Sequence, residues 1–367
     1  MNRAATVYDV ADRAGVSIAT VSRVLRTPEA VRPTTRDRVL DAVAALGYVP
    51  SGSARGLAER RTGVLGLYFP GFDAAEEAPL LDVLSAEADA ARAFTIVRDE
   101  VEGADHPSNL FLDDVLRGAE LEAWKQGFVL MIGVGRDDPD RSTVRDMAGR
   151  VDGLVVLASS VPDDVLARLA RRIPVVVLSG PPRGDRYDHV TVNNAEAMGE
   201  LTRLVLAETG GKAPAFLAGP IDSPDGAQRW QGFSAAITAA GISPDEVTVV
   251  RGDFTRGSGR LAAERLIAGA LPAAVMCAND QMALGALDAF RAAGVRVPAE
   301  LLVTGFDGID AAAHSHPRLT TVRQPMIELG RAAVQVLARR LERPEADPML
   351  VRLPLEVILR ESSLRPR

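Results

Sequence analysis

From residue 62 onward, short apolar runs alternate with amphipathic stretches, and this alternation limits the possible folds more than any other feature. The runs cover residues 64–69, 128–134, 154–158, 173–178, 190–192, 215–218, 247–250, 274–278 and 301–304. Stretches with helical spacing, such as 163–172, 195–208 and 281–293, separate most of them. Short apolar strands that alternate with helices predict parallel sheets covered by helices on both faces.

The number of runs exceeds what one small sheet needs, and 367 residues suggest two or three domains. We therefore expect an α/β body with two similar lobes, and we expect the chain to pass from the first lobe to the second near Asn193. Residues 1–50 differ, because they show short helical patterns and no strand signal. Residues 51–61 are small and basic, and we interpret them as a linker.

Composition excludes several classes of protein. Apolar residues make up 47% and charged residues 25% of the chain, as in soluble globular proteins. No apolar run approaches the roughly 18 residues of a membrane span, and the first six residues lack the apolar region of a secretion signal. A single cysteine, Cys277, excludes an internal disulfide framework and fits a reducing cytoplasm.

Charge is unevenly distributed along the chain. Residues 1–61 contain ten arginines and six acids, a net +4, whereas the remainder carries −11. A basic head on an acidic body is expected when only the head meets a polyanion. Chance clustering of surface charge is the alternative.

The head has the pattern of a helix-turn-helix. Thr6 and Asp9 resemble a capping box at the start of a first helix. Gly15 provides the freedom for a tight turn, and Ser17 can cap a second helix over 18–25. A third helix follows Pro33 and ends at Gly47. Two helices joined by a short glycine turn are typical of this DNA-binding motif.

The second helix would enter the major groove with its N-terminus first. Its outward residues are Ile18, Ala19, Ser22 and Arg23. Arg23 can bind guanine through two hydrogen bonds, and Ile18 and Ala19 can make apolar contacts. The hydroxyls available for phosphate contacts are those of Thr6, Ser17, Thr20 and Ser22. By spacing alone, a capped three-helix unit without DNA-binding activity remains the alternative.

The head resembles the DNA-binding domain of the lactose-repressor (LacI) family. The matching residues are Thr6-Val7-Tyr8-Asp9-Val10-Ala11, Ala14-Gly15-Val16-Ser17, Thr20-Val21-Ser22-Arg23-Val24-Leu25 and Leu46-Gly47-Tyr48-Val49-Pro50. The resemblance implies that Ile18, Ala19 and Arg23 read bases and that Tyr8 belongs to the DNA-binding set. It also implies that residues 51–61 form a hinge helix, in which Leu57, beside Ala54, wedges into the minor groove. Because Gly52 and Gly56 lower helix propensity, we expect this hinge to be disordered off DNA; a tether without DNA contact is the alternative.

Polar residues at strand ends point to a ligand site in the body. Ligands of open α/β sheets lie beyond the carboxyl ends of the strands. The residues at those ends are Ser179, Asp253, Phe254, Asn279, Asp280 and Asp307. Any fold of this class has polar strand ends, so the position alone leaves a site and ordinary surface equally open.

The resemblance extends to the body. The motifs are Val151-Asp152-Gly153-Leu154, Gly252-Asp253-Phe254, Ala278-Asn279-Asp280-Gln281-Met282 and Gly305-Phe306-Asp307. They resemble the family's two-lobed core, which is similar to periplasmic sugar-binding proteins. The implied ligand-binding residues are Phe111, Ser179, Arg229, Phe254, Asn279 and Asp307. Ser179 stands where many members have Asp, and Asn193-Asn194 replaces the usual Asp-Asn.

The resemblance also implies domain limits. The helix-turn-helix domain covers 1–50, the hinge 51–61, and the effector-binding and dimerisation domain 62–367. Within the last, we expect an N-lobe of 62–192 with 323–345 and a C-lobe of 193–322 with 346–367. Residues 71–107 are an insertion with ten acids and two arginines. For it we propose an acidic lid or an added dimer contact, with a short helix near 79–91; a disordered insert is the alternative.

Other signals favour no catalytic or metal chemistry. His314, His316 and Asp310 give only three metal ligands, and no glycine motif completes a phosphate-binding loop. We expect Cys277 to pack inside a strand and Asp280 to cap a helix. The prediction therefore names no catalytic residue, no metal and no cofactor.

The function that the sequence favours is a sequence-specific transcription regulator, a repressor, controlled by a small effector such as a sugar. Its expected partners are a near-palindromic double-stranded operator, the effector and a second copy of the chain in a homodimer, with no membrane. The expected location is cytoplasmic and nucleoid-associated. The alternatives are a cytoplasmic small-molecule-binding protein and an α/β enzyme acting on sugars or nucleotides; no enzyme motif is present.

Overall fold

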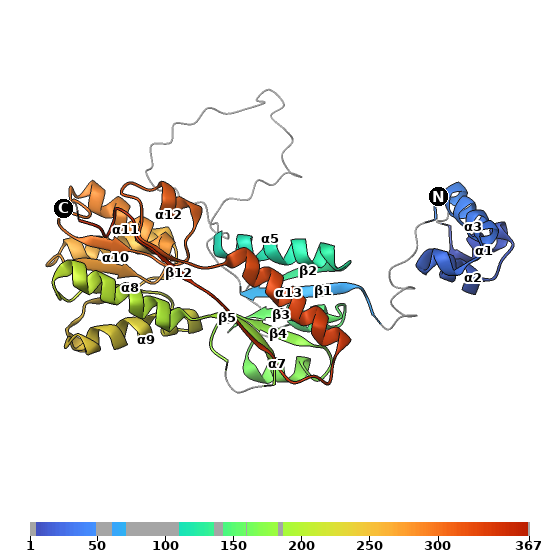
Figure 1. The fold of residues 1–367 in the computed structure, drawn as a ribbon, viewed down its shortest axis with the longest axis horizontal. Coiled ribbons are helices and arrows are strands. Elements are labelled where there is room, and N and C mark those ends of the chain that lie inside the picture. The colour runs from blue at the N-terminus through green and yellow to red at the C-terminus, as the bar shows by residue number, and fades with distance from the viewer. Residues whose placement is uncertain are drawn as a thin grey trace, which may run out of the picture. The chain divides into compact units, whose positions relative to one another are not determined.

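A computed structural model describes residues 5–48, 61–70, 110–135, 142–158, 160–182 and 186–365. The chain divides into two compact units, Met1–Gly63 and Val64–Arg367, which we describe separately as the head and the body (Figure 1). The expectations for the hinge at 51–60 and for the insertion at 71–107 lie outside the described residues.

The head contains three helices, α1 (Val7–Ala14), α2 (Ile18–Arg26) and α3 (Pro33–Leu46), with a short 3-10 turn at Pro28–Ala30. Apolar residues spaced three and four apart bring one side of each helix to a common core. The fully or nearly buried members are Val10, Ala11, Ala14, Val21, Val24, Val39 and Ala42. The expected three-helix arrangement is therefore confirmed.

The N-lobe of the body is built on a six-stranded sheet with the order β11-β5-β4-β3-β1-β2, all parallel. The strands are β1 (Val64–Pro70), β2 (Val129–Gly135), β3 (Gly153–Leu157), β4 (Val175–Leu178), β5 (Asp188–Val192) and β11 (Leu350–Leu353). Helices α5 (Leu110–Lys125) and α13 (Met326–Glu342) cover one face. Helices α6 (Ser142–Ala148) and α7 (Asp163–Leu169) cover the other. Alternation explains this division, since Leu65 and Leu67 pack towards α5 and α13 and Tyr68 packs towards α6.

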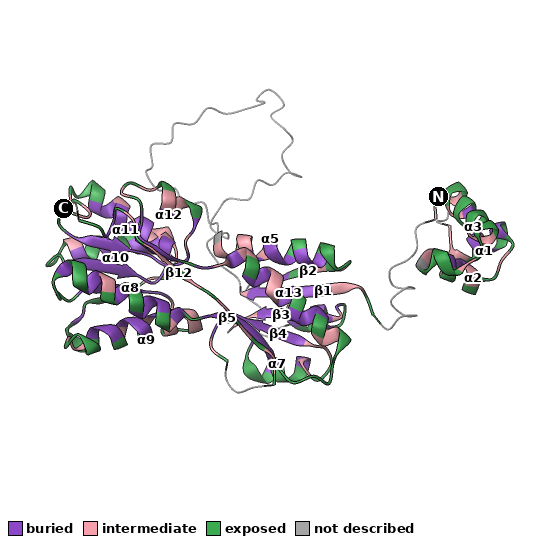
Figure 2. Cartoon of the chain, viewed as in Figure 1, coloured by how far each residue is buried: buried purple, intermediate pink, exposed green. Residues whose placement is uncertain are grey.

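The C-lobe has a four-stranded parallel sheet with the order β7-β6-β8-β9. The strands are β6 (Ala215–Ala218), β7 (Val249–Arg251), β8 (Ala274–Cys277) and β9 (Leu302–Thr304). The helices are α8 (Asn194–Thr209), α9 (Pro224–Ala239), α10 (Arg256–Ile267), α11 (Asp280–Ala292) and α12 (Asp310–His314). Figure 1 shows α8 with α9 on one side of the sheet and α10 with α11 on the other. Figure 2 shows that the central strands of both sheets are buried between their helices.

The chain crosses between the lobes three times. It leaves the N-lobe after Val192 and returns through β10 (Thr321–Arg323) into α13. The prediction that the chain passes back to the C-lobe at residue 346 is wrong. Residues Leu350–Leu353 form β11, which pairs with β5 at the edge of the N-lobe sheet, and only β12 (Glu356–Ile358) pairs with β10. The edge of β5 that does not pair with β4 pairs with β11 before the chain passes to the C-lobe.

Three helix pairs cross at glycines. A Cβ on Gly118 of α5 would lie 1.9 Å from the carbonyl oxygen of Ile327 in α13. The same distance separates a Cβ on Gly232 of α9 from the oxygen of Ala195 in α8. In the third pair, a Cβ on Gly285 of α11 would lie 1.9 Å from the oxygen of Arg256 in α10. Each pair can therefore approach this closely only because the side chain is absent.

Candidate functional site

In the head, local caps position α2. Thr6 accepts a 3.4 Å hydrogen bond from the amide of Asp9, whose carboxylate accepts a 2.7 Å bond from the amide of Thr6, so the capping box is present. Gly15 adopts a left-handed conformation with φ of 61° and ends α1. The hydroxyl of Ser17 then caps α2 by accepting a bond from the amide of Thr20 at 3.2 Å.

The outward side of α2 carries the residues that the sequence singled out. Ile18, Ala19 and Arg23 are exposed and Ser22 is half-buried, whereas Val21 and Val24 are buried in the core. The expected orientation is therefore confirmed. The ring of Tyr8 in α1 is 68% exposed. A small domain gains nothing in stability by exposing an isoleucine and a tyrosine, so this surface is available for contact. The hinge residues Ala54 and Leu57 lie outside the described part of the chain.

In the body, Arg229 of α9 occupies the centre of a buried polar network. Its Nε donates a 2.9 Å hydrogen bond to Asn194 Oδ1, and its Nη1 donates a 2.6 Å bond to the carbonyl of Ala278. Nη1 also lies 3.3 Å from Oδ1 of Asp307. The guanidinium stacks 3.9 Å above the ring of Phe306. The side chain of Arg229 thus joins α8, α9 and the ends of β8 and β9.

Asp307 and Asp225 continue this network into the lobe junction. Asp307 Oδ1 accepts a 2.7 Å bond from the side chain of Gln324, which follows the crossover strand β10. Asp225 Oδ1 accepts bonds from Asn194 at 2.8 Å and from the amide of Gly180 at 3.1 Å. Since Gly180 follows β4 of the N-lobe, Asp225 bridges the two lobes. Neither Asp225 nor Gln324 was predicted, because only their three-dimensional neighbours distinguish them from other surface residues.

Three predicted ligand-binding residues have unusual backbone conformations. Ser179, Phe254 and Asp307 have φ values of 65°, 72° and 124°, and they are the three non-glycine residues with positive φ in the described part of the chain. Such conformations cost free energy and concentrate at functional sites. All three directly follow strand ends or the loops beyond them, which is where the fold class places ligands.

Asn279 and Asp280 differ from expectation. Asn279, not Asp280, caps α11, since its Oδ1 accepts a 3.0 Å bond from the amide of Met282. Its Nδ2 donates to the carbonyl of Phe254 at 2.9 Å. Asp280 is fully buried and instead accepts bonds from the amides of Gly308 and Ile309 and from the hydroxyl of Thr321. The interpretation of Asp280 as a cap is therefore wrong, because its side chain turns towards the crossover.

The remaining predicted residues lie at the edges of the network. Phe254 is half-buried, and its ring lies over Gly219, where a Cβ would approach the ring to 2.2 Å. Ser179 is buried beside Gly180. Phe111, in the first turn of α5, is half-buried against the main apolar core.

Burial changes the acidity of the two central carboxyls. It raises the pKa of Asp307 to about 6, even though Arg229 and Gln324 favour the ionised form. It raises the pKa of Asp280 to about 7, and the neighbouring charge of Asp307 adds to this effect. Burial also raises the pKa of the Cys277 thiol, and this fully buried residue packs inside β8 as expected. Perturbed acids are common at ligand sites.

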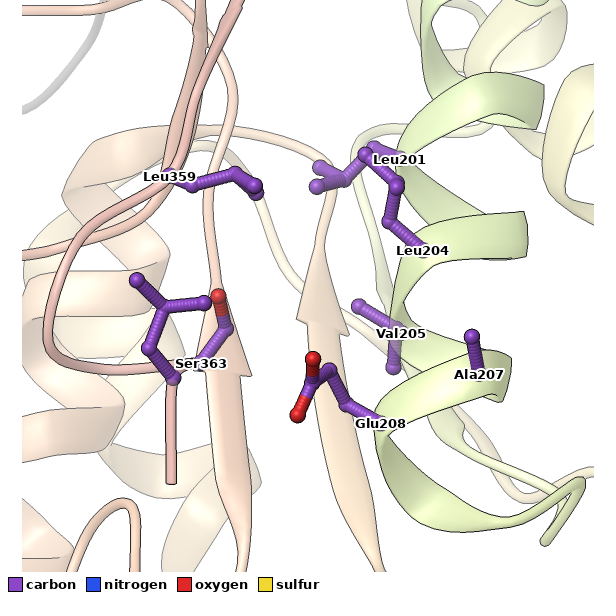
Figure 3. Close-up of a pocket in the computed structure, with 8 residues that line it drawn as sticks. Leu201, Leu204, Val205, Ala207, Glu208, Leu359 and Ser363 are labelled. Atoms are coloured by element: carbon purple, nitrogen blue, oxygen red, sulfur yellow. The ribbon is translucent and has the colours of Figure 1, made fainter. Parts of the chain in front are cut away.

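Two of the hollows in the described part of the body lie beside α8 and α9. A groove of about 370 Å³ lies between Pro181 of the N-lobe and the N-terminal part of α9, and its lining includes Ser223, Pro224 and Gln228. A smaller pocket of about 80 Å³ separates α8 from the C-terminal segment, where Leu201, Leu204 and Val205 face Leu359 and Ser363 (Figure 3). None of the predicted ligand residues lines either hollow. Pro224, which lines the groove, directly precedes Asp225 in the chain.

Within the described residues, no group of three or more His, Cys, Asp or Glu side chains could hold a metal ion. No helix in the ranges that the structure describes is long and apolar enough to cross a membrane.

Comparison with known proteins relates both units to characterised families. The profile of "Bacterial regulatory proteins, lacI family" matches residues 6–51, and that of a "Periplasmic binding protein-like domain" matches residues 205–363. The transcriptional repressor PurR of Klebsiella pneumoniae is 32% identical over 98% of this chain and 96% of its own. Catabolite control protein A of Priestia megaterium is 29% identical over 98% of this chain and 99% of its own.

Solved structures agree with this relationship. A transcriptional regulator, CelR, in complex with cellobiose is 31% identical, has a TM-score of 0.67 and is matched over 98% of this chain and 99% of its own. The lac repressor dimer bound to operator and the anti-inducer ONPF is 24% identical and shares the fold, with a TM-score of 0.80 over 99% of this chain and 100% of its own.

Proposed function

This chain belongs to the lacI family of bacterial regulatory proteins, and from that membership we propose that it is a sequence-specific repressor and that a small ligand controls its affinity for operator DNA. The observation that carries the DNA half is the exposed row of Ile18, Ala19 and Arg23 on a helix that Ser17 caps. A row of side chains that contributes nothing to the core is free to read base edges.

Contacts to DNA divide by chemistry. Arg23 offers a fork of donors to a guanine, which is worth about 1–3 kcal/mol of discrimination. Ile18 and Ala19 offer only apolar contacts, such as one with a thymine methyl. The hydroxyls of Thr6, Ser17, Thr20 and Ser22 and the phenol of Tyr8 are suited to phosphate oxygens. Ala54 and Leu57 of the hinge complete the proposed DNA-binding set.

The ligand half rests on the network around Arg229. We propose that a sugar or related ligand contacts Arg229, Asp307 and Asn279, with Phe254 as an aromatic wall and Ser179 and Phe111 at the margins. Buried arginine and carboxylate groups pair with hydroxyls, and an aromatic ring packs on the apolar face of a sugar ring. CelR, which is 31% identical, was solved with cellobiose, and this supports a carbohydrate.

A homodimer is the proposed active form. In the body, Trp124 of α5 is 78% exposed, and Val129, Ile132 and Val134 of the edge strand β2 are also exposed. Large exposed apolar residues grouped on neighbouring elements favour a protein interface. Two heads would then read the half-sites of a near-palindromic operator.

Control of DNA binding requires that the ligand bind two lobe arrangements with different affinities. We propose that the ligand changes the lobe arrangement and thereby the spacing of the hinges. The relatives of the chain are regulatory proteins, so no enzymatic reaction is proposed for it. A repressor acts on the chromosome, so we place it in the cytoplasm with the nucleoid.

The division of labour can be tested with two variants. Duplex sites are first enriched from a random-sequence library, and the sugar that most raises the melting temperature is identified from a panel of mono- and disaccharides. Arg23→Ala should abolish specific DNA binding and leave sugar binding intact, whereas Asp307→Ala should do the reverse. Arg38→Ala removes the same charge from an exposed site on α3 and serves as the control. Equal loss of both activities in both variants would contradict the proposal.

A further inference from the structure

We infer that the interlobe site takes an uncharged, polyhydroxylated ligand and rejects its phosphorylated counterpart, with Asp225 as a specificity-determining residue. This inference rests on the proposed function, because it concerns the ligand of the same site. It adds the rejection of the phosphorylated form and the role of Asp225.

Arg229, the buried cation of the site among the residues that the structure describes, is already neutralised. Arg229 lies 3.3 Å from Asp307 and also donates to the carbonyl of Ala278 and to Asn194. A phosphate would have to compete with Asp307 for this guanidinium. Of the other described cations near these strand ends, Arg251 is exposed and directed to the carbonyl of Gly219. Arg323 is paired with Glu356, and Arg256 is paired with Asp288. The site therefore has no described cation reserved for an anion.

Carboxylates outnumber the cations at the same place. Asp225 uses Oδ1 for its bonds to Gly180 and Asn194, and Asp307 uses Oδ1 for Gln324 and Arg229. No hydrogen bond to Oδ2 of either residue is present among the described residues. A carboxylate oxygen only accepts, so both residues offer acceptors to a ligand that carries O–H or N–H donors.

The helix N-termini at this edge are closed to anions. Helix N-termini bind phosphate through free amides and the helix dipole. Here Ser223, Thr255 and Asn279 cap α9, α10 and α11. The first turn of every described C-lobe α-helix except α10 carries an acid, namely Glu196, Asp225, Asp280 and Asp310. For α10, Asp253 accepts bonds from the amide and hydroxyl of Thr255 just before the helix.

The test compares each sugar with its own phosphate ester. Isothermal titration of the full chain at low salt is carried out with glucose, galactose, ribose, cellobiose and trehalose and with the corresponding sugar phosphates. We expect at least one neutral sugar to bind, and its phosphate to bind at least about tenfold more weakly, because a like charge is unscreened in a partly buried site. Asp225→Asn should reduce that preference severalfold or more, and Asp245→Asn, an exposed acid of the same lobe, should leave it unchanged.

The outcomes separate this inference from the proposed function. Tighter binding of a phosphate overturns the inference and leaves a ligand-controlled regulator in place. An unchanged preference in Asp225→Asn removes the role of Asp225. If no sugar and no sugar phosphate binds while DNA binding is retained, the proposed class of ligand is wrong. If Asp225→Asn fails to fold, Asp225→Ser, which keeps an acceptor for the amide of Gly180, replaces it.

Discussion

The hydroxyl of Thr321 donates a 2.6 Å hydrogen bond to Oδ1 of Asp280, and this bond ties the crossover strand β10 to the start of α11. The other oxygen of Asp280 accepts bonds from the amides of Gly308, at 2.7 Å, and Ile309, at 3.0 Å. One buried carboxyl thus holds the segment after β9 and the crossover in register. Its protonation state should therefore affect the stability of the body.

We predict that Asp280 makes the body less stable as pH rises from 5 to 8. Its pKa is raised from 3.8 to about 7, so in this range the folded chain keeps a proton that the unfolded chain has released. The contribution of Asp280 to the free energy of unfolding is therefore largest at low pH. It falls by up to about 1.4 kcal/mol per pH unit until the pH exceeds the pKa of Asp280 in the folded chain. Urea unfolding of Asp280→Asn at pH 5, 6, 7 and 8 should show a flatter profile. A profile parallel to that of the unsubstituted chain would refute this.

The glycine crossings predict a large loss of stability on a small substitution. A Cβ on Gly232 would lie 1.9 Å from the carbonyl oxygen of Ala195, so Gly232→Ala must push α8 and α9 apart. Overpacking of this kind costs about 1–3 kcal/mol or more. Gly269→Ala is the control, because its new Cβ would meet nothing closer than 3.8 Å. Chemical denaturation measures both, and equal stabilities would show that the helices separate without cost.

Trp124 should be a main contributor to the dimer interface. Buried tryptophans at interfaces commonly contribute 2 kcal/mol or more, which corresponds to a dissociation constant weakened by at least about thirtyfold. We therefore expect Trp124→Asp to be monomeric at micromolar concentration in sedimentation equilibrium. Leu261→Asp, an exposed leucine on α10, should leave the dimer intact. A dimer that survives Trp124→Asp but not Leu261→Asp would move the interface to the other surface.

Arg340 should be essential for the stability of the N-lobe sheet at its β5–β11 edge. Its Nε and Nη2 each donate a 2.8 Å bond to the carboxylate of Asp188 in β5, which also accepts from the amide of Met349 just before β11. Removing one partner of a buried ion pair costs about 3–5 kcal/mol. Arg340→Met should lose stability on that scale, and Arg340→Lys should lose less, because it keeps the charge but not the fork. Thermal unfolding distinguishes them, and equal loss would assign the effect to shape alone.

Patterns confined to a few neighbouring residues were predictable from the sequence. The capping box of Thr6 and Asp9, the turn at Gly15 and the cap of Ser17 are formed between residues at most three apart, so their chemistry is visible in the order of residues. The outward row of Ile18, Ala19 and Arg23 follows from the same periodicity. The nine apolar runs correspond to strands β1 to β9, and all but the edge strands β2 and β7, which are partly exposed, are mostly buried.

Tertiary structure decided what depends on distant partners. Strand β11 alternates half-buried and exposed residues and exists because the edge of β5 was open. Asn279 rather than Asp280 caps α11 because Thr321 and the amides of Gly308 and Ile309 hold the Asp280 carboxylate elsewhere. Asp225 joins the site because folding brings Gly180 and Asn194 to it. Local order determined the elements and the exposed row of the head, whereas long-range hydrogen bonds and burial determined which acids and bases meet between the lobes.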